Sequence, residues 1–137
     1  RFGAGTIVEA EIRLPTTGQG TGATVFAKLV LGSTSAGATG GLAALINVGS
    51  DAKAQLERDG VAQLRTFTAT VSLDVWYKLR MIQIGAWASV YLDGTLLGTG
   101  RAEISNEVAD YFLLSTYNSI ADFRNIKLWT LTGGIPA

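Results

Sequence analysis

The chain has 137 residues, 47% hydrophobic and 16% charged, which suits one globular domain. Eleven basic residues balance eleven acidic ones without a run of like charge, so neither a nucleic-acid-binding stripe nor a polybasic membrane patch is expected. Cysteine and histidine are absent, which excludes disulfides, thiolate metal sites and histidine catalysis and leaves mainly oxygen ligands, suited to calcium. No apolar run approaches the roughly 20 residues of a membrane span.

The first strand pattern lies near the start of the chain. Between residues 8 and 14, apolar residues alternate with Glu9, Glu11 and Arg13. A period of two predicts a strand with one buried face and one solvated face. Pro15 is expected to end this strand, because proline cannot donate to a ladder.

Three further segments before residue 60 favour strands. Residues 25–31 are apolar on both faces except for Lys28, as expected for a strand covered on both sides. Residues 42–48 are continuously apolar apart from one asparagine. Residues 52–58 have helix propensity, but so short a segment between two turn signals fits a hairpin arm better.

The second half of the chain continues as hairpins. Asp59-Gly60 and Asp93-Gly94 are signals for tight turns that need positive φ. Residues 101–110 are irregular and polar. Strand patterns occupy residues 61–71, 76–84, 87–93, 95–98, 111–117 and 123–131. The whole pattern predicts an all-β fold.

One domain is predicted over residues 1–132, followed by a tail or linker at 133–137. The chain opens at Arg1 rather than Met, so we expect a processed form or a domain excised from a larger protein. No internal repeat and no second-domain pattern is present in the sequence.

Apolar residues on the later strands are expected to fill the core. We predict that Trp76, Val90, Leu92, Ile126 and Leu128 are mostly buried, because each lies on the apolar face of its strand.

Trp76 raises a question of register, because it has the same parity as Lys78 and Arg80. A regular strand would place all three on one face. A bulge after Trp76 would put the ring in the core and the two basic residues outside. Without that bulge, either Trp76 or the basic pair is misplaced.

Three sequence blocks resemble one protein superfamily. Glu9, Ala10, Ile12, Leu14 and Pro15 are similar to the family 16 glucanase pattern G-x-x-E-A-x-I-x-L-P, with one extra residue after Gly5. Val90 to Gly94 match "hydrophobic-Tyr-hydrophobic-Asp-Gly" behind the Trp76 strand, and Phe123 to Leu128 match "F-x-N-I-x-hydrophobic". The order resembles the concanavalin A-like lectins, laminin G-type domains and glucanases. The resemblance implies an antiparallel two-sheet β-sandwich of the jelly-roll type, with about ten to thirteen strands.

The glucanase catalytic pattern E-x-D-x-x-E is missing. A retaining enzyme needs two carboxyl groups about 5–5.5 Å apart, and the corresponding residues 42–48 hold no acid. Glu9 with Glu11, and Glu57 with Asp59, share strand parity but fit a solvated charge ladder and a turn better. We therefore predict no enzyme activity, no catalytic residue and no cofactor. The sequence contains no Asp-rich loop, so no metal site is predicted.

A candidate ligand-binding face comprises Trp87, Tyr91, Lys78 and Arg80. Trp87 and Tyr91 lie opposite the core-facing residues of their strand, and Lys78 and Arg80 share a face of the neighbouring strand. The resemblance implies that the outer face of a concave sheet holds sugar. Aromatic rings stack on pyranoses, while basic groups donate to hydroxyls. The alternative is structural: Trp87 packs under a loop, and Tyr91 is an amphipathic strand residue.

The function predicted from these features is a non-catalytic module that binds carbohydrate or a protein surface, as part of a larger extracellular, cell-surface or virion protein. The alternative is a purely structural domain for capsid decoration, a fibre or a filament, in a homo-oligomer or larger assembly. Low charge and strands that are apolar on both faces favour this alternative. Neither nucleic acid nor membrane insertion is expected.

Overall fold

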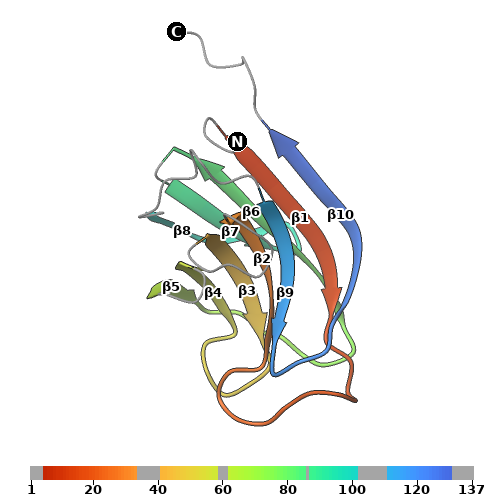
Figure 1. Cartoon of the computed structure of the whole chain (residues 1–137). Coiled ribbons are helices and arrows are strands. Elements are labelled where there is room, and N and C mark those ends of the chain that lie inside the picture. The colour runs from red at the N-terminus through yellow and green to blue at the C-terminus, as the bar shows by residue number, and fades with distance from the viewer. Residues whose placement is uncertain (1–4, 34–40, 59–61, 86, 102–110, 131–137) are drawn as a thin grey trace, which may run out of the picture.

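The computed structural model describes residues 5–33, 41–58, 62–85, 87–101 and 111–130. These residues form two antiparallel five-stranded sheets packed face to face, and none of them is helical (Figure 1). The fold is a β-sandwich, as predicted, and its ten strands lie within the expected range. No described segment is a helix able to cross a membrane.

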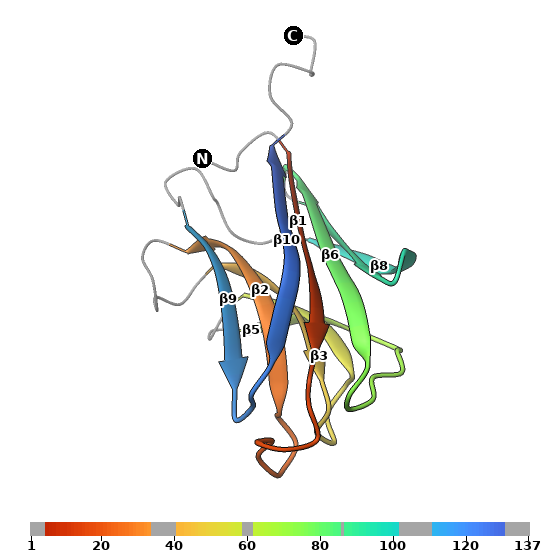
Figure 2. The ribbon, with the colours of Figure 1, turned by 90° about the vertical axis from the view of Figure 1, so that its right-hand side faces the viewer.

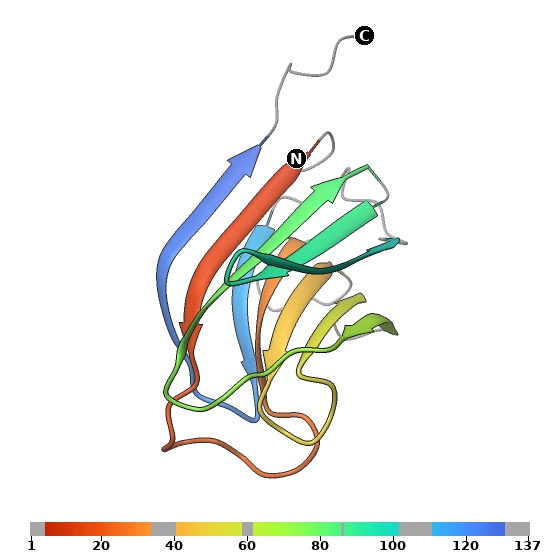
Figure 3. The same cartoon turned by 180° about the vertical axis from the view of Figure 1, so that it is seen from behind.

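The first sheet has the order β10-β1-β6-β7-β8 and is seen from behind in Figure 3. Its strands are β1 (Thr6–Arg13), β6 (Trp76–Ile84), β7 (Trp87–Leu92), β8 (Thr95–Arg101) and β10 (Asp122–Thr130). The second sheet has the order β5-β4-β3-β2-β9. Its strands are β2 (Phe26–Ser33), β3 (Leu42–Asn47), β4 (Ala54–Arg58), β5 (Ala62–Phe67) and β9 (Tyr111–Tyr117).

The predicted strands appear in the predicted order with shifted ends. The hairpin arm at residues 52–58 is indeed a strand, β4. The strand expected over residues 61–71 is wrong in length, because β5 ends at Phe67. The Asp59-Gly60 turn, the segment 102–110 and the tail 133–137 lie outside the described residues.

The core lies between the sheets and is filled by alternate residues of each strand. The contacts that join the sheets run between β1 and β2, between β3 and β6, and between β5 and β8. Inward-facing side chains are almost fully buried: Val8, Ala10, Ile12, Leu79, Met81, Ala88, Val90 and Leu92 from the first sheet, and Ala27, Leu29, Leu31, Leu42, Ala44, Ile46, Ala54 and Leu56 from the second. Burial of Val90 and Leu92 confirms the predicted register of β7.

The strand at residues 25–31 is covered on both faces, as predicted. Val30 is fully buried although it lies on the face opposite the core-facing Leu29 and Leu31. Lys28 on that same face is 8% exposed and forms an ion pair with Glu57 at 3.2 Å. A buried lysine needs such a partner, because an uncompensated charge there is costly.

The predicted burial of Ile126 and Leu128 is wrong, although Leu128 has inward parity. Leu128 pairs with the core residue Val8, yet it is 44% exposed, and Ile126 is 49% exposed. Both belong to β10, the edge strand of the first sheet; Figure 2 views the sandwich from the side of β10 and β9. Contacts between the sheets are concentrated on the other strands, so little covers β10 from the opposite side.

A bulge also interrupts β10. The partners of Glu9 and Glu11 are Lys127 and Arg124, so β10 carries one extra residue in between. Asn125 takes up the irregularity with a φ of 51°. Such a bulge turns the side chains that follow it and is common on edge strands.

The hairpin between β7 and β8 has the predicted tight turn. Asp93 and Gly94 have φ values of 50° and 83°, so both central residues are left-handed, as in a type I′ turn. Asp93 Oδ1 also accepts a hydrogen bond of 2.7 Å from the backbone N–H of Lys78. The turn therefore fixes the end of β7 against β6.

Replacing Gly94 with valine is expected to lower the free energy of unfolding by about 1–3 kcal/mol. A Cβ at this position meets no atom within 4 Å, so the cost comes from the backbone conformation rather than from a clash. Urea denaturation measures it, with Gly94→Asn as the control, because asparagine tolerates positive φ. Equal midpoints for the valine and asparagine variants would contradict the assignment.

Candidate functional site

The outward faces of β1, β6 and β7 bring polar side chains of the three strands together. In the cross-strand register Glu11 lies beside Lys78, and Arg80 lies between Glu9 on one side and Tyr91 on the other. Directly paired side chains on one face of a sheet are close enough to interact. Residues separated by more than 60 positions in the chain therefore become neighbours.

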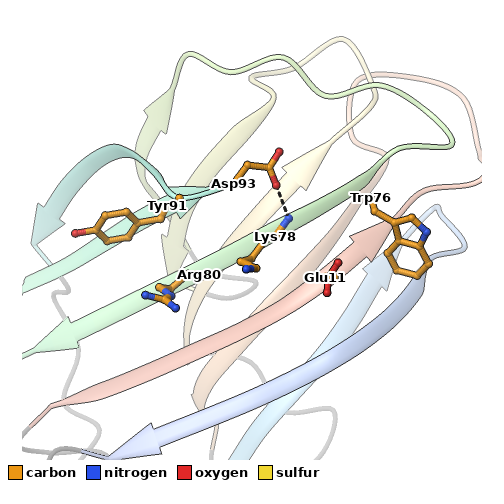
Figure 4. A pocket seen from close by; sticks show the side chains of 7 residues that line it. Glu11, Trp76, Lys78, Arg80, Tyr91 and Asp93 are labelled. Atoms are coloured by element: carbon orange, nitrogen blue, oxygen red, sulfur yellow. Dashed lines mark hydrogen bonds between the residues drawn. The ribbon is translucent and has the colours of Figure 1, made fainter.

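This surface contains a pocket of about 430 Å³. It is lined by Glu11, Trp76, Lys78, Arg80, Tyr91, Asp93 and Gly94. Figure 4 shows Trp76, Lys78 and Arg80 in a row along β6, with Glu11 on one side and Tyr91 and Asp93 on the other. Trp76 and Tyr91 thus flank a floor of basic side chains.

β6 has no bulge after Trp76, and of the two assignments left open it is the prediction of a buried Trp76 that is wrong. β1 and β6 pair without interruption from Arg13 opposite Trp76 to Thr6 opposite Gln83. Strand parity therefore places Trp76 on the same outward face as Lys78 and Arg80. The ring is partly buried there and joins the pocket.

Two guanidinium groups hold the indole of Trp76. The Cζ of Arg124 lies 3.8 Å from the ring centroid, and the Cζ of Arg13 lies 5.1 Å from it. Cation–π attraction of this kind stabilises both partners. Each guanidinium also forms an ion pair: Arg13 with Asp122 at 2.6 Å, and Arg124 with Glu11 at 3.1 Å. The ring therefore has a fixed orientation at one end of the pocket.

Glu9 is buried, which corrects its assignment to a solvated charge ladder. Its side chain is 3% exposed, and its Oε1 accepts a hydrogen bond of 2.8 Å from Nε of Arg80 and lies 2.7 Å from Nη2 in an ion pair. Arg80 is also 5.6 Å from the ring centroid of Trp129. These contacts fix the guanidinium at the pocket, since a buried carboxylate requires a partner.

Glu11 is ionised at the rim of the pocket. Hydrogen bonds from the amide of Asn125 and then from the guanidinium of Arg124 lower the pKa of Glu11 below 4.5, and the nearby positive charge of Lys78 acts in the same direction. Glu11 therefore stays negative in mildly acidic solution. It is not suited to act as a general acid, which needs a raised pKa.

The structure brings three of the four predicted ligand-binding residues together. Lys78, Arg80 and Tyr91 line the pocket. Trp87 lies on the same face of β7 and is 55% exposed, so no loop covers it fully. It stands four residues, or about 13 Å of strand, from Tyr91 and does not line the pocket.

The sequence-based prediction missed four pocket residues: Trp76, Glu11, Asp93 and Gly94. The parity of Trp76 with Lys78 and Arg80 was the signal that could have identified it. Nothing in the sequence identified Glu11, because its neighbour Lys78 belongs to a strand distant in the chain.

Metal ligands do not gather anywhere in the described ranges. No group of three or more acidic, histidine or cysteine side chains among these residues is arranged to hold an ion. Asp93 and Asp122 are engaged with the Lys78 backbone and with Arg13. Asp74 accepts hydrogen bonds from the hydroxyl and the backbone N–H of Thr16, which lower its pKa.

Solved structures share this fold. A carbohydrate-binding module, CBM66 from Bacillus subtilis, aligns with a TM-score of 0.76 at 18% identity, covering 92% of this chain and 75% of the module. The Caenorhabditis elegans galectin LEC-6 aligns with a TM-score of 0.61 at 11% identity, over 93% of this chain and 84% of the galectin. A PL7 alginate lyase from Zobellia galactanivorans aligns with a TM-score of 0.56 at 13% identity, over 92% of this chain and 62% of the lyase.

These likenesses establish a concanavalin A-like jelly-roll sandwich. No protein-family model and no curated protein sequence matches the chain. At such low identity the comparisons show the fold alone, because one fold hosts many functions. A binding module, a lectin and a lyase all use this architecture.

Proposed function

We propose that the protein is a non-catalytic carbohydrate-binding module whose ligand occupies the pocket on the outward face of β1, β6 and β7. The observation that carries the proposal is that the rings of Trp76 and Tyr91 lie on either side of Lys78 and Arg80 in this pocket. Aromatic rings cover the apolar faces of a pyranose, while ammonium, guanidinium and carboxylate groups bind its hydroxyls. Fixed side chains reduce the entropy lost on binding.

The comparisons support this proposal without deciding it. The structures that share the fold include a carbohydrate-binding module and a galectin, and a sugar ligand for this chain agrees with the role that the name of the module states. Proteins with that role act where glycans are exposed, so we further propose an extracellular or cell-surface location.

The state of the acidic residues favours binding over hydrolysis. Glu9 and Glu11 project from one strand, and each is neutralised by an arginine. Glycoside hydrolysis needs two carboxyl groups that face each other across the bond, one of them with a raised pKa. Glu57 on the second sheet is paired with Lys28. No described acid has the environment of a catalytic proton donor.

Replacing Tyr91 with alanine is expected to weaken glycan binding about tenfold, since a stacked ring contributes about 1–1.5 kcal/mol. The measurement is a glycan array on the folded variant, followed by calorimetry with the best glycan and an assay for shortened products. Tyr117→Ala is the control, because Tyr117 is 57% exposed on the second sheet, where it stacks on Phe26. Loss of affinity in the control alone would move the site to the second sheet.

Trp87 is proposed to extend the same platform for longer chains. Trp87→Ala should leave the affinity for a disaccharide unchanged and lower the affinity for the polysaccharide, because the ring lies beyond the pocket along β7. Equal loss with both ligands would place Trp87 in the primary site.

An assembly role is the second candidate, and one observation favours it. Ile126, Leu128 and Trp129 are 49%, 44% and 40% exposed on the edge strand β10. Exposed apolar residues along a sheet edge are typical of interaction surfaces. Light scattering separates the two candidates: a monomer with glycan affinity supports binding, and a stable oligomer without affinity supports assembly.

A further inference from the structure

The outward face of the first sheet carries more basic than acidic side chains. Its described basic residues outnumber its acidic ones by six to four: Arg13, Lys78, Arg80, Arg101, Arg124 and Lys127 against Glu9, Glu11, Asp93 and Asp122. The full sequence has no net charge, so positive charge is concentrated on this face relative to the rest of the chain. A face of one sign attracts ligands of the other.

The acidic groups of this face are already engaged. Three of them form ion pairs: Asp122 with Arg13 at 2.6 Å, Glu9 with Arg80 at 2.7 Å, and Glu11 with Arg124 at 3.1 Å. Asp93 accepts the backbone N–H of Lys78 through its Oδ1. Arg13, Arg80 and Arg124 therefore each have a counterion, and the remaining carboxylate, Asp93, stabilises the turn.

Lys78 has no such counterion. Within the described part of the chain, its ammonium forms no ion pair and no hydrogen bond, although it lies in the floor of the pocket and is exposed. Arg80, its neighbour on the same face, uses Nε and Nη2 on the single Oε1 atom of Glu9. Its Nη1 hydrogens have no partner among the described residues, so donors of two cationic groups are available side by side.

We propose, resting on the carbohydrate-binding function above, that the pocket takes acidic glycans, with a sugar carboxylate or sulfate bound between Lys78 and Arg80. An anionic group there completes the hydrogen bonding of the ammonium and the guanidinium, and charge-assisted bonds of this kind are the stronger ones. Trp76 and Tyr91 then contact the sugar rings on either side.

The test compares acidic and neutral glycans of matched backbone by calorimetry. The probes are oligogalacturonate against galactan oligosaccharide, and dextran sulfate against dextran. Lys78→Gln is the test variant, because it removes no ion pair and should leave the fold intact. Lys127→Gln is the matched control: it removes the same charge from the same sheet face at a position outside the pocket.

We expect the wild type to bind at least one acidic probe about tenfold or more tightly than its neutral counterpart. Lys78→Gln should lose about tenfold in affinity for that probe, and Lys127→Gln less than about twofold. Affinity should fall when salt rises, because exposed charges are screened. Preference for oligogalacturonate identifies the bound group as carboxylate, and preference for dextran sulfate identifies it as sulfate.

Two results would overturn the inference. Equal binding of acidic and neutral probes, lost in Tyr91→Ala, would leave the carbohydrate-binding function standing and refute acidic selectivity. Equal losses in Lys78→Gln and Lys127→Gln would show diffuse attraction to the face rather than a site at Lys78. Absence of binding to every glycan on the array refutes the proposed function itself.

Discussion

Replacing Leu79 with alanine should lower the free energy of unfolding by about 2–5 kcal/mol. Leu79 is fully buried in β6, between the β1 and β7 strands of the first sheet and against the second sheet. Truncation removes apolar burial and leaves a cavity that surrounding strands cannot close. Chemical denaturation followed by tryptophan fluorescence or circular dichroism measures the change.

Leu128→Ala is the matched control, because it removes the same atoms from the same side of the first sheet. Leu128 is 44% exposed on the edge strand, so its truncation should cost only about 1 kcal/mol. If Leu128→Ala lowered the free energy of unfolding as much as Leu79→Ala does, the β10 edge would be covered in solution. That outcome would favour the assembly role.

Replacing Arg80 with methionine should lower the free energy of unfolding by about 2–3 kcal/mol. Methionine keeps the apolar stem of the side chain and removes the guanidinium that neutralises Glu9. The Glu9 side chain is 3% exposed, so its charge would be left without a partner in a poorly solvated position. The value is below that of a fully buried pair because the Arg80 side chain is 39% exposed.

The comparison for this prediction is Arg124→Met, which breaks the pair with Glu11. There the side chains are 49% and 22% exposed, and surface pairs contribute about 0–1 kcal/mol. Adding Glu9→Gln to Arg80→Met should recover part of the stability, because it removes the unpaired charge. Equal stability of the two methionine variants would show that Glu9 is hydrated in solution.

The outer-face assignment of Lys78, Arg80 and Tyr91 follows from local sequence pattern. In a strand the side chains alternate strictly, so the apolar residues Val90 and Leu92 determine that Tyr91 faces outward. The turn at Asp93-Gly94 is equally local, because it depends on which residues tolerate positive φ. For such features the sequence is sufficient, since the physical cause lies within a few residues.

At Trp76 the residue type is misleading, whereas strand parity with Lys78 and Arg80 indicates the correct, outward face. The size and apolar character of Trp76 predict a place in the core, which would require a bulge after it. The unbroken ladder with β1 rules the bulge out and places the ring against Arg13 and Arg124. An aromatic ring on an outward face becomes stable when cations from adjacent strands cover it, which only the pairing of those strands provides.

The alternation of polar and apolar residues determined by itself that this chain is all-β and which side chains of a strand share a face. The tertiary structure alone decided how deeply each face is buried and which residues meet. Leu128 and Val8 share the inward side, but only Val8 has a sheet above it, because β10 lies at the edge. Glu9 is buried and Glu11 lies at the pocket because β6 and β10 flank β1. A period of two sets the direction of a side chain, whereas strand order and edge position depend on long-range pairing that the local pattern does not encode.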